Sequence, residues 1–301
     1  MKISFSTSTH IGFERECNED SFAYCNNLNL KMWNTQLKNQ YIPLDSYGAI
    51  AIVADGMGGA NAGDIASSTA IKSIINEINT SDIGSIIESQ ESITNYLSNI
   101  IYKANKSLLD YIEHAPETIG MGTTITILWI VYNKAYIAWC GDCRCYVFNK
   151  NRGLLRLTED HSYVQELINK GELTIDDAFN HPNSNIITKC LGDCDVSSVP
   201  DILIHEINPN DQYILCSDGL SGYCKDTSIE EVLLQTNSNN AESLLELALS
   251  QKANDNITII SISIKDNDNE EINNSFLYRI KRFFCKKNPH HSSCKTNHFI
   301  L

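Results

Sequence analysis

Carboxylates recur beside the apolar, strand-like runs of this sequence, and they are the side chains best placed to carry out chemistry. Some follow predicted strands and others directly precede them; in chain order they are Glu19, Asp20, Asp55, Asp142, Asp218 and Asp255. A carboxylate at the end of a rigid strand can share one cleft with others of its kind. Converging like charges repel one another unless cations lie between them. The pattern therefore predicts a site for metal cations.

The most distinctive position is Asp55, which opens the stretch Asp-Gly-Met-Gly-Gly (55–59) directly after the apolar run 49–54. The glycines permit a tight turn and leave backbone carbonyl and N–H groups open to a ligand, because no side chain blocks the approach. Helical spacing of apolar residues over 62–79 places the stretch at a strand-to-helix corner. Asp-Gly is also a common turn signal, so this stretch alone leaves a turn and a ligand site both open.

The predicted ligands are oxygen atoms throughout, a set that selects Mn²⁺ or Mg²⁺ rather than zinc. One bridging acid flanked by others suits two ions about 3.5–4 Å apart, which can deprotonate a water and polarise a phosphoryl oxygen. The sequence has no P-loop lysine pattern, no Gly-x-Ser-x-Gly and no His-Glu-x-x-His. Cys143 beside Arg144 does not favour a cysteine phosphatase, because that thiolate needs a helix start and a strand is predicted here. His161 is interpreted as structural.

Periodicity predicts both strands and helices, and it places the carboxylates relative to them. Alternating and β-branched runs predict strands over 3–6, 21–24, 49–54, 123–131, 135–139, 145–148, 212–217 and 257–264. Apolar residues at helical spacing predict helices over 62–79, 92–113, 228–235 and 241–252, with a short one within 160–171.

The composition is that of a globular chain with an acidic balance. Its 301 residues, 42% of them hydrophobic, suffice for one large domain or two average ones. The net charge of -14 argues against nucleic acid, which is bound through clustered Lys and Arg. No apolar run approaches the about 20 residues that span a bilayer.

Cysteine usage indicates a reducing compartment. The eleven cysteines are an odd number, and the amino terminus does not resemble a signal peptide. We therefore expect reduced thiols in the cytoplasm. The closest cluster, Cys140, Cys143 and Cys145, falls short of the about four ligands of a zinc site.

The carboxyl-terminal region differs in composition from the body, which is expected to end near residue 265. Residues 266–275 have the composition of an acidic linker, and 276–301 contain six basic residues and no acid. The basic tail could form an amphipathic helix on a membrane surface or a partner. It could equally dock on the acidic body or be disordered, and the sequence leaves these alternatives open.

Seven motifs, in order, make this sequence resemble the metal-dependent protein serine/threonine phosphatases of the type 2C (PPM) family, in their bacterial form. The motifs are Arg15-x-x-x-Glu19-Asp20, the stretch 55–59, Gly122-Thr123-Thr124, Gly141-Asp142-x-Arg144, Leu157-Thr158-x-Asp160-His161-Ser162, Ser217-Asp218-Gly219-Leu220 and Asp255-Asn256. The resemblance covers about 7–264, so residues 1–265 are expected to form the phosphatase domain.

The resemblance implies an α+β fold with four layers, α/β/β/α. A central antiparallel β-sandwich would be flanked by helix pairs, with a binuclear metal cleft at one edge. This agrees with the predicted elements, because two layers of apolar strands need amphipathic helices to cover them.

The resemblance also implies the ligand set. Asp55 would bridge two Mn²⁺ or Mg²⁺ ions, and Asp218 and Asp255 would complete the coordination of one of them. The carbonyl of Gly56 and the carboxylate of Glu19 would hold the other.

Three further roles follow from the same resemblance. Asp20 would support the metal site from behind, and Asp142 with Asp218 would form a weaker third-ion site. Arg15 would bind the substrate phosphate, a task suited to its planar fork of donors.

The implied activity is hydrolysis of phosphoserine and phosphothreonine in proteins by one-step attack of a metal-bridging hydroxide. The partners would be phosphorylated protein substrates of a serine/threonine kinase, and the protein would be a cytoplasmic monomer, peripheral to a membrane if the tail binds one. Two departures from the family pattern, Ala60 and Cys143, remove no ligand. Met57 stands where animal members carry an acid catalyst, so the general acid is not identified. The alternative is a non-catalytic binding module on the same fold, which should have lost metal ligands.

Overall fold

The computed structural model describes residues 1–34, 40–58, 62–193, 198–236 and 240–266 of the chain. Residues Met1–Lys265 form one compact unit. Gly59 and Ala60, and all but the first residue of the expected linker and tail, lie outside the described residues. Among the helices that are described, none is long and apolar enough to cross a membrane.

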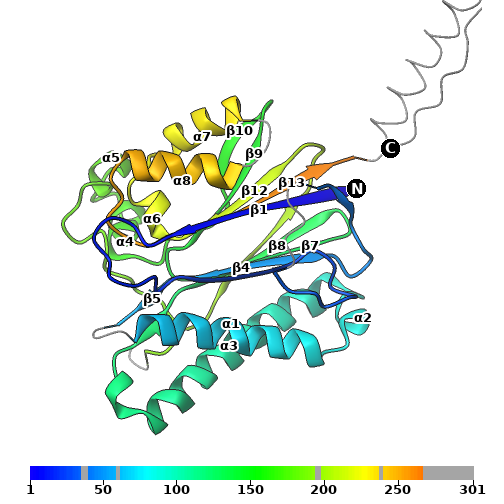
Figure 1. Ribbon diagram of the computed structural model, residues 1–301, viewed down its shortest axis with the longest axis horizontal. Helices are drawn as coiled ribbons and strands as arrows, with labels where there is room; N and C mark the ends of the chain where they lie inside the picture. Colours follow the sequence, from blue (N-terminus) through cyan, green and yellow to red (C-terminus); the bar gives the residue numbers. More distant parts are fainter. Residues whose placement is uncertain (35–39, 59–61, 194–197, 237–239, 267–301) are drawn as a thin grey trace, which may run out of the picture. The chain divides into compact units, whose positions relative to one another are not determined.

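Two antiparallel sheets form the centre of the unit (Figure 1). The first has the strand order β10-β9-β12-β13-β1-β3 and the second β11-β8-β7-β4-β2. The strands of the first sheet are β1 (Lys2–His10), β3 (Ile42–Pro43), β9 (Arg144–Asn149), β10 (Gly153–Arg156), β12 (Gln212–Cys216) and β13 (Ile257–Lys265). Those of the second are β2 (Ser21–Cys25), β4 (Ala49–Ala54), β7 (Ile125–Val131), β8 (Lys134–Cys140) and β11 (Asp201–Glu206). A short pair, β5 (Gly56–Met57) and β6 (Gly122–Thr123), lies beyond the end of β4.

Helices cover the outer face of each sheet (Figure 1). The long helices α1 (Gly63–Thr80) and α3 (Gln90–His114) pack against the second sheet, and α7 (Asp226–Gln235) and α8 (Asn240–Ser250) against the first. Short helices occupy the connections: α2 (Ile83–Ile86), the 3-10 turn η1 (Pro116–Thr118), α4 (Tyr163–Asn169), α5 (Ile175–Ala178) and α6 (Asp218–Ser221).

The side chains of β4 show why the unit has four layers. Ile50 and Ile52 point toward the helices α1 and α3, whereas Ala51 and Val53 point into the core between the two sheets. Side chains alternate along a strand, so a strand covered on both sides reads as an unbroken apolar run. A third core lies between the first sheet and α7 and α8. The predicted α+β, four-layer fold is confirmed.

The predicted strands and helices are present in the structure, but several short elements and two edge strands were not predicted. The strand expected over 123–131 is interrupted at Thr124, where β6 ends and β7 begins. The short elements that were not predicted include β3, β5, α2, α5 and α6. The edge strands that were not predicted are β10 and β11. Each pairs with a single neighbour, β9 or β8, and is only partly buried, so neither carries the apolar run that marks a central strand.

We expect Leu128→Ala to lower the free energy of unfolding by about 2–5 kcal/mol, because Leu128 is fully buried between the sheets and its loss leaves a cavity. Urea denaturation followed by circular dichroism measures this. Leu234→Ala is the matched control: Leu234 is 47% exposed, so the change should be below about 0.5 kcal/mol. Equal losses in the two variants would contradict the assignment of the inter-sheet core.

Candidate active site

The antiparallel pairing brings the predicted acidic positions to one end of the sandwich. The last residue of β4, Ala54, lies opposite the first residue of β2, Ser21, so Asp55 and Asp20 emerge side by side. In the first sheet the end of β12, Cys216, lies opposite Ile259 near the start of β13. Asp218 and Asp255 therefore emerge together as well. Asp142, in the turn between β8 and β9, completes the group.

The backbone of Asp55 is held in place by two threonines. The hydroxyl of Thr124 accepts a hydrogen bond from the Asp55 N–H at 3.0 Å, and the Thr124 N–H donates to the Asp55 carbonyl at 2.9 Å. The Thr123 hydroxyl donates to the same carbonyl at 2.8 Å. These bonds satisfy the backbone at the strand end and leave the Asp55 carboxylate free for other partners.

Gly56 and Gly63 allow the start of α1 to approach Glu19. A Cβ atom on Gly56 would lie 2.1 Å from the Gly63 carbonyl oxygen and 2.6 Å from that of Glu19. A Cβ atom on Gly63 would lie 2.8 Å from the Glu19 carboxyl carbon. Real Cβ atoms do not approach so closely, so both positions need glycine because backbone meets backbone here.

Neutral side chains attach the segment 15–20 to the first sheet. Ser217 donates its hydroxyl to Asp20 Oδ2 at 2.7 Å, and Asn256 Oδ1 accepts from the Glu19 N–H at 2.7 Å. The amide nitrogen of Asn256 donates to the carbonyls of Ile11 and Cys17 at 2.8 and 3.0 Å. Ser217 and Asn256 belong to two of the sequence motifs, and these contacts give each of them a structural role.

The gathered carboxylates raise one another's pKa values. Burial, and then the charges of Asp218, Asp20 and Asp142, raise the pKa of Asp55 well above its ordinary value. Burial raises the pKa of Asp20 to about 7, against the lowering effect of its hydrogen bond from Ser217. Burial and the charge of Asp255 raise the pKa of Asp218 to about 6. The site therefore favours neutralisation, by protons or by cations.

The unsatisfied oxygens of this cluster fit bound cations. Asp20 Oδ1, Asp142 Oδ1 and Asp218 Oδ1 are buried and lack a hydrogen-bond partner among the described residues. A buried carboxylate oxygen without a donor is costly, and a hard divalent cation is the natural partner for several of them. In the described part of the chain, no three acidic, histidine or cysteine side chains lie in an arrangement that already meets the geometry of a metal site.

Arg15 forms an ion pair with one of the acids of the cluster. Its Nη2 donates to Asp255 Oδ2 at 2.7 Å, and the two side chains are 49% and 26% exposed. The hydrogen bond to Asp255 raises the pKa of Arg15, and the guanidinium neutralises a carboxylate of the cluster.

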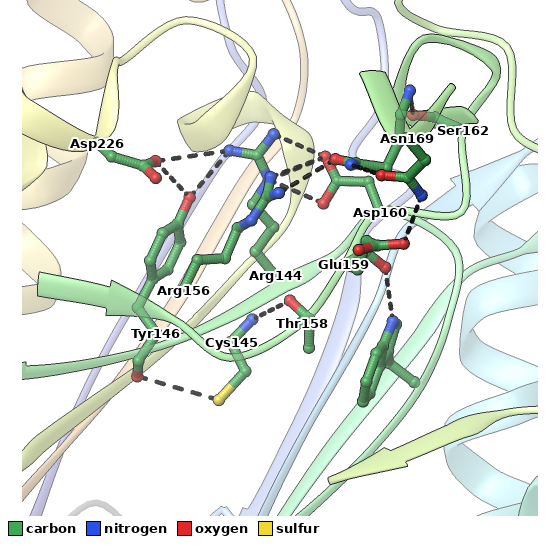
Figure 2. Close-up of polar contacts among 12 residues, drawn as sticks. Arg144, Cys145, Tyr146, Arg156, Thr158, Glu159, Asp160, Ser162, Asn169 and Asp226 are labelled. Carbon is green, nitrogen blue, oxygen red and sulfur yellow. Dashed lines mark hydrogen bonds and ion pairs between the residues drawn. The ribbon is translucent and has the colours of Figure 1, made fainter. Parts of the chain in front are cut away.

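A second arginine, Arg144, forms the most extensive ionic network of this region (Figure 2). Its Nε and Nη2 donate to the Asp160 carboxylate at 2.9 and 2.7 Å, and its Nη1 donates to the Tyr146 hydroxyl at 3.0 Å. The Tyr146 hydroxyl in turn donates to Asp226 at 2.9 Å. Arg144 thereby ties β9 to the segment before α4 and to the start of α7. The motif that contains Arg144 was recognised, but only the structure identifies these partners.

His161 is structural, as interpreted from the sequence. Its Nδ1 accepts a hydrogen bond from the Gly141 N–H at 3.0 Å, and its Nε2 lies 3.3 Å from Asp201. The ring stacks on Trp139 with 6.0 Å between centroids. Cys143 is also buried, and burial raises the pKa of its thiol. A buried thiol with a raised pKa is poorly suited to act as a nucleophile.

Comparison with known proteins agrees with this geometry. The family model of protein phosphatase 2C matches residues 8–257. The serine/threonine phosphatase stp of Listeria monocytogenes is 36% identical over 215 residues, which cover 71% of this chain and 83% of the relative. The crystal structure of the serine/threonine phosphatase Stp1 from Staphylococcus aureus matches with a TM-score of 0.76 at 30% identity, covering 88% of this chain and 96% of that one.

A further solved structure is the catalytic domain of the serine threonine protein phosphatase PstP in complex with two manganese ions. It matches with a TM-score of 0.70 at 28% identity, covering 88% of this chain and 99% of that one. The four-layer fold with its acidic end thus defines the class, the metal-dependent protein phosphatases. The chain belongs to the protein phosphatase 2C family, in its bacterial form.

We expect Asp55→Asn to stabilise the protein in the presence of a chelator. A carboxyl group whose pKa is raised by folding stabilises the folded state only while protonated. As pH rises, this contribution is lost between about 4 and about 7 for Asp20 and between about 4 and about 6 for Asp218. The pKa of Asp55 is raised too, so its contribution is lost in the same direction. Removing one charge should raise the free energy of unfolding at pH 7 by about 1 kcal/mol or more.

The gain of Asp55→Asn over the wild type should shrink as pH falls toward 4 and reverse when Mn²⁺ is added, as urea denaturation would measure. Asp110→Asn is the control, because Asp110 is exposed on α3. A gain that is independent of pH would contradict the electrostatic explanation.

Proposed function

We propose that the protein hydrolyses phosphoserine and phosphothreonine in phosphorylated proteins, with Mn²⁺ or Mg²⁺ as its cofactor. The observation that carries this proposal is the cluster of aspartates with unpaired buried oxygens beside an arginine, at the end of a protein phosphatase 2C fold. The named relatives are serine/threonine phosphatases. The physiological substrates would be products of a serine/threonine kinase.

We assign the ligands as the family resemblance implies. Asp55 would bridge two ions, with Asp218 and Asp255 on one side and Glu19 and the Gly56 carbonyl on the other. Asp20 would support this set through its bond from Ser217. Asp142, whose Oδ1 is buried and unpaired among the described residues, would take a weaker third ion together with Asp218.

The bound ions would supply an activated water as nucleophile and would polarise the phosphoryl oxygens. The residues of the chain perform the remaining tasks. Arg15, half-exposed at the rim of the cluster, is positioned to donate two hydrogen bonds to a phosphate, and its charge would offset the charge of that group. Met57, in β5, carries no proton to give to the leaving seryl or threonyl oxygen.

The alternative function, a non-catalytic binding module, lacks support. Such a module should have lost ligands, whereas each acidic position is retained and Asp20, Asp142 and Asp218 keep unpaired buried oxygens in the described residues. A purely structural role would not explain the retention of mutually repelling charges.

We expect Mn²⁺-dependent hydrolysis of p-nitrophenyl phosphate and of a phosphothreonine peptide by the intact protein. Asp55→Asn and Asp218→Asn should each lower kcat/KM by at least about a hundredfold, because each removes a ligand charge from the site. Asp110→Asn on the exposed face of α3 is the control and should retain full activity. No Mn²⁺-dependent turnover in the intact protein would contradict the proposal.

A second expectation concerns Arg15. Arg15→Ala should raise KM for the phosphopeptide about tenfold or more, because a charge-assisted hydrogen bond to phosphate is lost. Arg15→Lys should recover only part of this loss, since lysine cannot form the bidentate contact. Steady-state kinetics at saturating Mn²⁺ separates KM from kcat. An unchanged KM in Arg15→Ala would exclude phosphate binding by this side chain.

A further inference from the structure

A pocket with a volume of about 550 Å³ opens directly beside the carboxylate cluster. Asp142, Asp218 and Asp255 form one end of it. Its walls come from two separate parts of the chain, the region of α4 and α5 on one side and the segment from α6 to the start of α7 on the other. Whatever occupies the pocket therefore lies against a molecule bound at the cluster.

The ionic network of Arg144 forms part of the lining of the pocket, and Figure 2 shows its contacts. Arg144 and Asp160 both line the pocket, and their bidentate pair leaves them 19% and 11% exposed. Asp226, on the opposite wall, lies 3.6 Å from Arg144 and accepts from Tyr146. Arg156 also lines the pocket and lies 3.6 Å from Asp160. The two arginines and the two aspartates balance in charge, so this part of the lining offers an incoming side chain little net charge.

The wall formed by α4 and α5 carries a group of apolar side chains. They are Val164, Ile168, Ile175, Ala178 and Phe179, and the polar residues Gln165 and Asp176 lie among them. Ile175 is 76% exposed to solvent, and such an apolar side chain gains free energy when another apolar group covers it. Tyr223 and Cys224 continue the apolar surface on the opposite wall. The chemistry of the walls suits an aliphatic or aromatic side chain.

One lysine bridges the two walls. Lys225 Nζ lies 2.7 Å from Asp176 Oδ1 and 5.8 Å from the centre of the Phe179 ring. The charge of Lys225 is therefore paired with the Asp176 carboxylate and with the face of the Phe179 ring. This contact connects α5 to the residue before α7 and leaves no unpaired cation in this part of the lining to attract an acidic side chain.

We propose that this pocket binds an apolar side chain of the substrate phosphoprotein, close in sequence to the phosphorylated serine or threonine. The proposal rests on the proposed phosphatase function, because the occupant is the molecule whose phosphate lies at the cluster. Its support is the continuity of the pocket with that site, the apolar wall and the mutual pairing of its ionic groups. The phosphatase would thus select substrates by the residue in the pocket as well as by the phosphate.

The test compares phosphothreonine peptides that carry leucine, aspartate, lysine or glycine at each flanking position in turn, at saturating Mn²⁺. We expect one position at which leucine raises kcat/KM about tenfold over glycine. Ile175→Asp should abolish that preference and favour lysine at the same position. Ile175 is largely exposed, so the substitution should not affect folding.

Ile119→Asp is the matched control, because Ile119 is 74% exposed and does not line the pocket. It should leave the peptide preference unchanged. Hydrolysis of p-nitrophenyl phosphate, which is too small to reach the pocket, should be equal in the wild type and both variants. A wild type that shows no leucine preference, or an Ile175→Asp variant that retains it, would overturn the pocket proposal. If the wild type does not hydrolyse p-nitrophenyl phosphate at all, the proposed phosphatase function itself would be overturned.

Discussion

Repulsion between carboxylates gathered at one end of the β-sandwich is the constraint on which the rest of this structure depends. Burial, and then the charges of neighbouring carboxylates, raise the pKa values of Asp20, Asp55, Asp142 and Asp218. Folding must force them together against this repulsion. A large hydrophobic interior opposes this repulsion, and it consists of one cluster between the sheets and one between each sheet and its helices.

The fold positions these acids through groups that carry no charge. Thr124 holds the backbone of Asp55, Ser217 donates to Asp20 and Asn256 accepts from the backbone of Glu19. Neutral hydrogen-bonding groups fix these chain segments without occupying all carboxylate oxygens, so Asp20, Asp142 and Asp218 each keep an unpaired oxygen among the described residues. Gly56 and Gly63 serve the same end by letting two backbones meet beside Glu19.

The two arginines of the region illustrate how burial separates binding from positioning. Arg15 is half-exposed and, within the part of the chain that the structure describes, forms an ion pair only with Asp255, so an incoming phosphate can compete for it. Arg144 is largely buried and donates to Asp160 and Tyr146 together. Breaking so many charge-assisted bonds in a low-dielectric setting is costly. Arg144 therefore acts as a fixed part of the pocket, while Arg15 is available to a ligand.

The sequence by itself determined the main elements, the four-layer fold class and the acidic positions, because these depend on local periodicity and on motifs of a few residues. The unbroken apolar run of β4 and the Asp55 that follows it are such local features. The metal roles of the acids stay predictions. Only the tertiary structure decided that Arg15 pairs with Asp255, 240 residues away, and that α4 and α5 face α6 and α7 across a pocket. These contacts arise from the packing of layers onto one another, which no local pattern encodes. The edge strands β10 and β11 were not predicted because only their pairing with neighbours in the folded sheets makes them strands.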